Sequence, residues 1–133
     1  MQESMRIPII RLYNNLIVSI QVALSDALLE RLTEDITQAI ERSRPRGLII
    51  DISGIDVMDS FISRAVRDIG ILARLMGVQT VISGMAPMIA MTIVEMGVDL
   101  KGVHSALDLE GALQFLAIGA TGRVMDDTGQ WME

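Results

Sequence analysis

The sequence contains no cysteine. That absence excludes a disulfide-bonded scaffold, a metal site built on thiolates and catalysis by a thiol. Aromatic residues make up only 3% of the chain, so a hydrophobic core has to be built from aliphatic side chains and the 10 methionines. No apolar run approaches the roughly 20 residues of a membrane-spanning helix, and the first residues lack the basic and apolar regions of a secretion signal.

Basic residues are also scarce. The chain has 11 Lys and Arg residues against 17 Asp and Glu residues, which gives a net charge of -6. Phosphate backbones and anionic lipids repel such a protein, so we expect neither nucleic acid nor a membrane among its main partners. The 133 residues fit one domain, and a hydrophobic share of 50% is enough for a sizeable core.

The common catalytic and nucleotide-binding motifs are missing as well. The sequence has no P-loop, no G-x-G-x-x-G after a strand, no H-E-x-x-H and no G-x-S-x-G. His104 is the only histidine, so a Ser-His-Asp triad would have to join it to Ser60. We therefore expect no cofactor, no metal ion and no enzymatic activity.

The segments that remain alternate between strand and helix patterns. Two β-branched segments, residues 6–12 and 16–20, are separated by Tyr13-Asn14-Asn15 and predict a β-hairpin, because Asn tolerates positive φ in tight turns. The later elements predicted are a helix from Ser25 that ends at Pro45, a strand over 47–51, a helix over 60–76, a strand over 79–83, a helix over 86–96, a short strand within 98–103, and a helix from 106 to about 116 capped by Ser105.

This order predicts an α/β fold in one domain over residues 1–118. Parallel strands joined by helices require right-handed crossovers, so we expect one mixed, mostly parallel sheet with helices packed on it. The N-terminal hairpin supplies the antiparallel strand. Residues 119–133 contain Gly and Asp without periodicity, and we expect them to form a flexible C-terminal tail.

The helix predicted over 86–96 is apolar nearly all round. Its methionines, with one just before it, are Met85, Met88, Met91 and Met96. Deep burial against the sheet is the commoner arrangement for such a helix. The alternative is a partly exposed, methionine-rich surface for a protein partner. The second arrangement would favour self-association, since a large exposed apolar patch lowers solubility.

The most informative segment is Asp51-Ile-Ser-Gly-Ile-Asp-Val-Met-Asp-Ser60, which joins a predicted buried strand to a predicted helix. Ser60 stands where that helix begins. A serine there can cap the helix, and it can equally carry a phosphate, because a helix N-terminus stabilises negative charge. The preceding acids, Asp51, Asp56 and Asp59, form either a solvated loop or, with Ser53, a Mg²⁺ site.

The same segment resembles the signature of STAS domains, the sulphate-transporter and anti-sigma-factor-antagonist family. The predicted order of elements matches that family over roughly residues 6–116. Phe61 stands where many members have a second hydroxyl, and this departure, with Leu75-Met-Gly77, Ile82-Ser-Gly84 and Val94-Glu-Met-Gly97, is similar to the scaffold subunits of bacterial stressosomes.

The resemblance implies a cytoplasmic, non-catalytic scaffold that holds a switch serine kinase until the kinase phosphorylates Ser60. A phosphatase would reset the cycle, and a paralogous STAS scaffold bearing a sensor domain would co-assemble with the chain. The partner-binding residues implied are Asp56, Asp59, Ser60, Phe61, Ser83 and Gly84. Two alternatives are a free anti-sigma-factor antagonist and a small enzyme that uses Ser60 or the acidic loop.

Overall fold

A five-stranded sheet forms the centre of the molecule. The computed structural model describes residues 6–21, 23–100, 102–121, 124–125 and 131–132. The strands, in spatial order, are β1 (Ile9–Leu12), β2 (Asn15–Ser19), β3 (Gly47–Asp51), β4 (Gln79–Ser83) and β5 (His104–Ala106). β1 is antiparallel to β2, and the other neighbours are parallel. The predicted fold class is therefore confirmed, including the N-terminal hairpin.

A tight turn sets the register of this hairpin. Tyr13 and Asn14 have φ of 51° and 66°, and both lie in the left-handed region that suits a two-residue hairpin turn. Asn15 was predicted to belong to the turn, but it is the first residue of β2 and pairs with Leu12. Its buried side chain closes the turn, because Nδ2 donates to the Tyr13 carbonyl oxygen at 3.3 Å.

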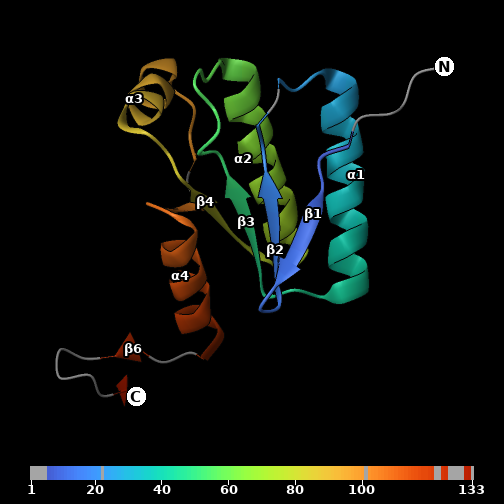
Figure 1. Cartoon of the computed structure of the whole chain (residues 1–133), viewed down its shortest axis with the longest axis vertical. Helices are drawn as coiled ribbons and strands as arrows, with labels where there is room; N and C mark the ends of the chain where they lie inside the picture. The colour runs from blue at the N-terminus through green and yellow to red at the C-terminus, as the bar shows by residue number, and fades with distance from the viewer. Residues whose placement is uncertain (1–5, 22, 101, 122–123, 126–130, 133) are drawn as a thin grey trace.

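In the described part of the chain, four helices pack around the sheet: α1 (Asp26–Ser43), α2 (Ser60–Leu75), α3 (Pro87–Met96) and α4 (Leu109–Thr121). α1 and α2 cover one face of the sheet, α4 packs on the other, and α3 lies at the end of the molecule where α2 begins (Figure 1). Ser25 caps α1 as predicted, with the Leu28 amide donating to its Oγ at 3.1 Å.

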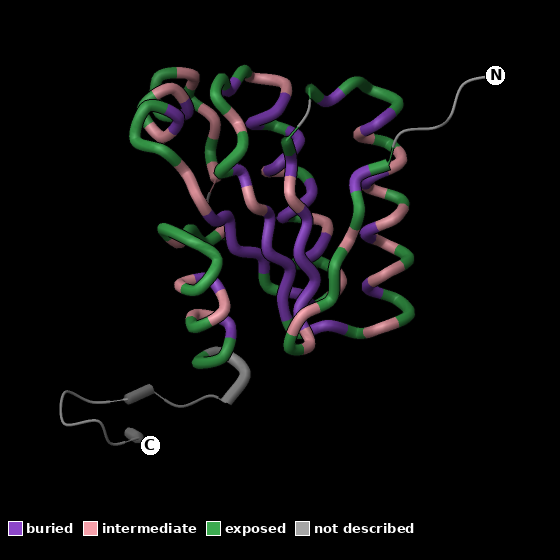
Figure 2. The backbone as a smooth tube through the Cα atoms, viewed as in Figure 1, coloured by how far each residue is buried: buried purple, intermediate pink, exposed green. Residues whose placement is uncertain are grey.

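Two cores result from the alternation of side chains along the strands. The larger core lies between the sheet and the helices α1 and α2, and it includes Leu48 and Ile50 of β3. The smaller core lies beneath α4, where Ile49 packs with Leu116. Buried residues accordingly run along the central strands (Figure 2), and they belong to the cores on both faces of the sheet. This is the pattern expected of parallel strands covered on both sides.

The C-terminal third differs from the sequence prediction. The strand expected within 98–103 is wrong, because the Val103 amide donates to the Leu100 carbonyl in a turn and Gly102 has φ of 85°. The strand β5 starts only at His104. Ser105 lies within β5 and caps nothing. Asp108 takes that role, accepting from the Gly111 amide at 2.8 Å, so α4 begins three residues later than predicted, at Leu109.

The segment predicted to be a flexible tail contains secondary structure in its described part. α4 continues to Thr121, and two short strands, β6 (Val124–Met125) and β7 (Trp131–Met132), pair antiparallel. The flexibility of residues 119–133 stays a prediction. Among the described residues, none of the helices has the length and apolarity needed to span a bilayer.

Candidate functional site

Ser60 is the first residue of α2, as predicted, and lies just beyond the carboxyl end of the sheet. Its side chain is half-buried, and its hydroxyl has no hydrogen-bond partner among the residues that the structure describes. In the first turn of a helix, the backbone N–H groups lack intrahelical acceptors and carry partial positive charge. Ser60 therefore combines an unengaged hydroxyl with an environment that tolerates added negative charge.

Asp59, and not Ser60, caps α2. The Asp59 Oδ1 accepts from the Ile62 amide at 2.8 Å, and the Asp59 carbonyl oxygen accepts from the Ser63 amide at 3.0 Å. Asp59 has the extended backbone of a capping residue, with φ of -112° and ψ of 176°. The hypothesis that Ser60 caps the helix is thus wrong, because the preceding carboxylate already occupies the capping position.

The other serines nearby are engaged and buried. Ser63 is 1% exposed, and its Oγ donates to the Asp59 carbonyl oxygen at 2.9 Å. Ser83 is 0% exposed and donates to Asp51 Oδ1 at 3.1 Å. The side chain of Ser83 thus lies beneath the surface, and its role in partner binding stays a prediction. Gly84 is half-buried, with φ of 80°.

Asp51 joins the ends of three strands. Its Oδ2 accepts from Ser53 at 2.8 Å and from Ser19 at 3.3 Å, and its Oδ1 accepts from Ser83. Ser19, Asp51 and Ser83 are the last residues of β2, β3 and β4 and lie in register. Ser19 was not among the predicted site residues, because its place beside Asp51 depends on the order of strands in the sheet.

The loop before α2 presents acidic and apolar side chains together. Asp56 and Asp59 are exposed, as a partner-binding role requires, and Phe61 is half-buried against the main core. Val57 is 77% exposed, whereas the next residue, Met58, is 5% exposed and anchors the loop in the core. Val57 was not among the predicted site residues. Its place as an apolar residue between the acids Asp56 and Asp59 is the signal that could have identified it.

The geometry does not favour the alternative chemistries. The Asp51 oxygens accept from serine hydroxyls, and an Asp59 oxygen caps α2. Accordingly, the described residues hold no group of three or more potential metal ligands. His104 packs on Phe115 with ring centroids 4.5 Å apart, and it lines a hollow with Arg74 at the C-terminal end of α2. Ser60 lies at the other end of that helix, about 20 Å away, so a Ser-His-Asp triad does not form.

The helix α3 exposes Met88 and Met91, whereas Met96 at its end is half-buried against the main core. Only Ile89 and Ile93 of this helix are buried, while Met88, Met91 and Val94 are 73%, 60% and 78% exposed. The expectation of deep burial against the sheet is therefore wrong. α3 lies beside the start of α2, at the end of the sheet rather than over a face, and so contacts the body along one side (Figure 1).

Comparison with known proteins gives a consistent picture. The family model described as STAS domain matches residues 6–112. The RsbT co-antagonist protein RsbRA of Bacillus subtilis (strain 168) is 28% identical over 124 residues, which are 92% of this chain and 45% of RsbRA. RsbRB of the same strain is 32% identical over 82 residues, which are 62% of this chain and 30% of RsbRB. The chain therefore spans less than half the length of these curated relatives.

Two solved structures resemble the chain over most of their length. One is an RsbS variant from Moorella thermoacetica in which a serine is replaced by glutamate. It is 34% identical, has a TM-score of 0.76, and is matched over 86% of this chain and 97% of its own. The other comes from work on the molecular architecture of the stressosome, described as a signal integration and transduction hub. It is 36% identical, has a TM-score of 0.76, and is matched over 85% of this chain and 98% of its own.

Proposed function

The chain belongs to the STAS domain family, and we propose that it is a non-catalytic scaffold of a bacterial stressosome whose hold on a switch serine kinase is released by phosphorylation of Ser60. The similarity to RsbS and to a stressosome structure supports a scaffold role in a stress-signalling pathway. The kinase would be of the RsbT type, because the curated relatives are RsbT co-antagonists.

The observation that carries the proposal is the free hydroxyl of Ser60 at the start of α2. Asp59 supplies the cap, so the hydroxyl can be modified without removing a hydrogen bond that holds the helix. The first-turn amides of α2 also favour negative charge at this position. Phosphorylation at Ser60 would leave the fold intact and change only the surface.

That change of surface would act through charge. A phosphate adds about -1.5 to -2 charges and three acceptor oxygens. At Ser60 these would stand beside the exposed carboxylates of Asp56 and Asp59. A kinase surface fitted to the unmodified loop would then meet like-charge repulsion and a desolvation cost. Release of the kinase needs no conformational change in the STAS domain.

The remaining partners follow from the assembly that we propose. A paralogous, sensor-bearing scaffold of the RsbR type co-assembles with the chain, a phosphatase removes the phosphate from Ser60, and the complex operates in the cytoplasm. The chain itself contributes binding surfaces and a phosphoacceptor, and the kinase and phosphatase contribute the chemistry.

Phosphate mapping tests the phosphoacceptor. The protein is incubated with the RsbT-type kinase and ATP, and the modified peptide is identified by mass spectrometry. We expect one phosphate, at Ser60, which is abolished by Ser60→Ala and retained in the matched control Ser63→Ala. Phosphate found only at Ser63 or Ser83 would contradict the proposal.

Kinase binding tests the switch. We expect Ser60→Ala to bind the kinase as tightly as the wild type, because the loop surface keeps its charge. Ser60→Asp adds one negative charge beside Asp56 and Asp59, and we expect it to weaken binding by about ten-fold. Calorimetry with all three proteins measures this difference. Equal affinities would rule out release by charge.

A further inference from the structure

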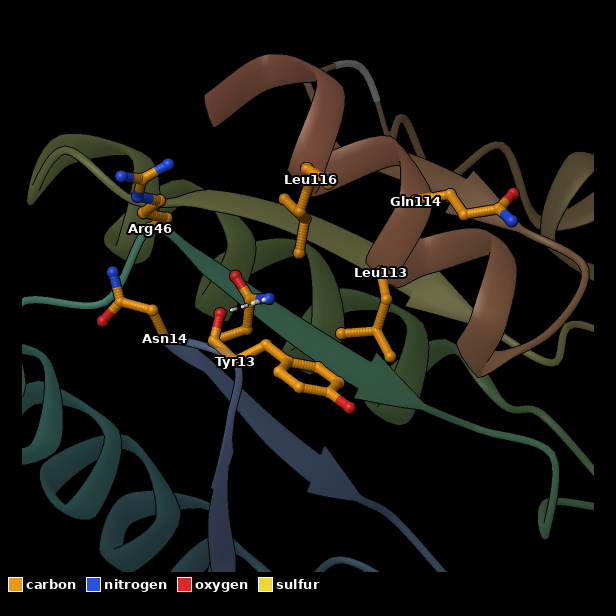
Figure 3. A pocket seen from close by; sticks show the side chains of 8 residues that line it. Tyr13, Asn14, Arg46, Leu113, Gln114 and Leu116 are labelled. Carbon is orange, nitrogen blue, oxygen red and sulfur yellow. Dashed lines mark hydrogen bonds between the residues drawn. The ribbon is translucent and has the colours of Figure 1, made fainter. Parts of the chain in front are cut away.

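A hollow of about 440 Å³ lies at the opposite end of the sheet from Ser60, between α4 and the β1–β2 turn. Leu113 and Leu116 extend into it from α4, the ring of Tyr13 lies across from them, and Arg46 and Asn14 stand at one side (Figure 3). This volume falls in the range of about 300–1,000 Å³ that is typical of small-molecule sites.

The walls of the hollow are largely apolar, and its polar side chains include Asn14, Asn15, Arg46 and Gln114. Asn15 lines it and is 6% exposed. Its Nδ2 donates to the Tyr13 carbonyl, whereas its Oδ1 has no donor among the residues that the structure describes. An apolar lining with a small number of convergent polar groups is the usual composition of a ligand site.

Two arginines, Arg11 and Arg46, lie at this end of the molecule, although the chain as a whole carries -6. Arg11 donates to Asn14 Oδ1 at 2.8 Å, and the backbone amide of Arg46 donates to the Asn14 carbonyl at 2.9 Å, so both arginines are held at the turn. The Arg46 guanidinium is exposed and has no acidic partner among the described residues. Among the described residues that line the hollow, none is acidic.

We propose that this hollow binds a small amphiphilic anion, with an aromatic or short acyl body against Leu113, Leu116 and Tyr13 and its anionic group on Arg46. A guanidinium suits a carboxylate because it presents its donors in a planar fork. The site is separate from Ser60 and does not rest on the proposed function.

A matched pair of dyes tests the site. Anilinonaphthalene sulfonate and N-phenylnaphthylamine share an aromatic body, and only the first carries an anion. We expect saturable, one-to-one binding of the sulfonate with fluorescence enhancement, and binding about five-fold weaker in Arg46→Gln. The neutral dye should bind equally well to both proteins. Decanoate should displace the sulfonate dye, and decanol should displace it less.

Three further variants locate the dye. Ala117 is exposed and lines the hollow, so Ala117→Phe should fold normally and block binding. Arg64→Gln, a change of an exposed arginine on α2, is the matched charge control and should bind as the wild type does. Loss of the signal in Met91→Gln, or sulfonate binding unchanged in both Arg46→Gln and Ala117→Phe, would overturn the proposal. If Arg46→Gln weakened the binding of both dyes equally, the proposal that the ligand is an anion would be overturned.

Discussion

The carboxylate of Asp59 and the hydroxyl of Ser60 are adjacent in the chain but differ in what they bind. Asp59 satisfies the Ile62 amide, whereas Ser60 has no partner among the described residues. Capping of α2 and the proposed phosphorylation therefore fall to different residues. A phosphoacceptor that also capped the helix would alter the fold whenever it was modified.

Variants of these neighbours should separate the two roles. We expect Asp59→Ala to lower the free energy of unfolding by about 1 kcal/mol, because a side-chain cap is lost. Ser60→Ala should change it by less than about 0.5 kcal/mol, since no hydrogen bond is removed. Urea unfolding followed by circular dichroism measures both values. A larger loss of unfolding free energy for Ser60→Ala than for Asp59→Ala would show that Ser60, and not Asp59, caps α2.

Thr80 of β4 offers a test of core packing. It is 2% exposed, and its Oγ1 has no hydrogen-bond partner within the described part of the chain. A buried hydroxyl without a partner destabilises the fold. We expect Thr80→Val, which keeps the shape and removes the hydroxyl, to raise the free energy of unfolding by about 1 kcal/mol. Thr80→Ser keeps the hydroxyl and should lower it. A neutral or destabilising Thr80→Val would mean that the hydroxyl has a partner in solution.

At the scale of elements, the end of β4 is packed tightly against the loop that leads to Ser60. Gly84 follows β4 with φ of 80°, and a Cβ there would lie 2.7 Å from the Ser53 Cβ and 3.0 Å from the Ser53 backbone nitrogen. Ser53 in turn donates to Asp51 at 2.8 Å. The loop is thus held by both a hydrogen bond and a close backbone approach.

Two glycines with similar backbone conformation separate the penalty for a left-handed residue from the cost of a clash with Ser53. Gly97 ends α3 with φ of 71°, and a Cβ there would meet nothing within 4 Å. We expect Gly97→Ala to lower the free energy of unfolding by about 1 kcal/mol, which is the penalty for the left-handed conformation alone. Gly84→Ala adds a clash with Ser53 and should lower the free energy of unfolding by about 3 kcal/mol. Thermal unfolding of the two variants gives the comparison. Equal costs would show that the loop moves freely away from Gly84.

The elements that sequence could predict are those in which local pattern and packing agree. β3 is a short apolar run and the helix that starts at Ser60 has clear helical periodicity, and both were placed to within a residue or two. β5 was misplaced because Gly102 delays it, and the burial of α3 was misjudged because its apolar pattern does not reveal what lies beside it. The Asp51 cluster was found only in part, since strand order brings Ser19 to it.

At the scale of the whole molecule, the two ends of the sheet differ in character. The end with Ser60 carries exposed acids and the exposed apolar residues Val57, Met88 and Met91. The other end carries Arg11 and Arg46, which lie beside the β1–β2 turn, and the hollow between that turn and α4. Exposed methionines suit protein partners, because the unbranched side chain adapts to varied surfaces. A protein partner and an amphiphilic anion would thus bind at opposite ends without competition.

Self-association should depend on the exposed face of α3. Met88 and Met91 are one turn apart, and burying them in a symmetric contact removes apolar surface from water. We expect Met88→Gln/Met91→Gln to weaken self-association by at least about ten-fold, with unchanged stability, since neither residue belongs to the core. Glu30→Gln/Glu34→Gln on the exposed side of α1 is the matched control and should associate normally. Light scattering over a range of concentrations, alone and with the RsbR-type paralogue, measures the assemblies. A wild-type protein that stays monomeric at high concentration and forms no large complex with the paralogue would contradict both the α3 interface and the stressosome scaffold.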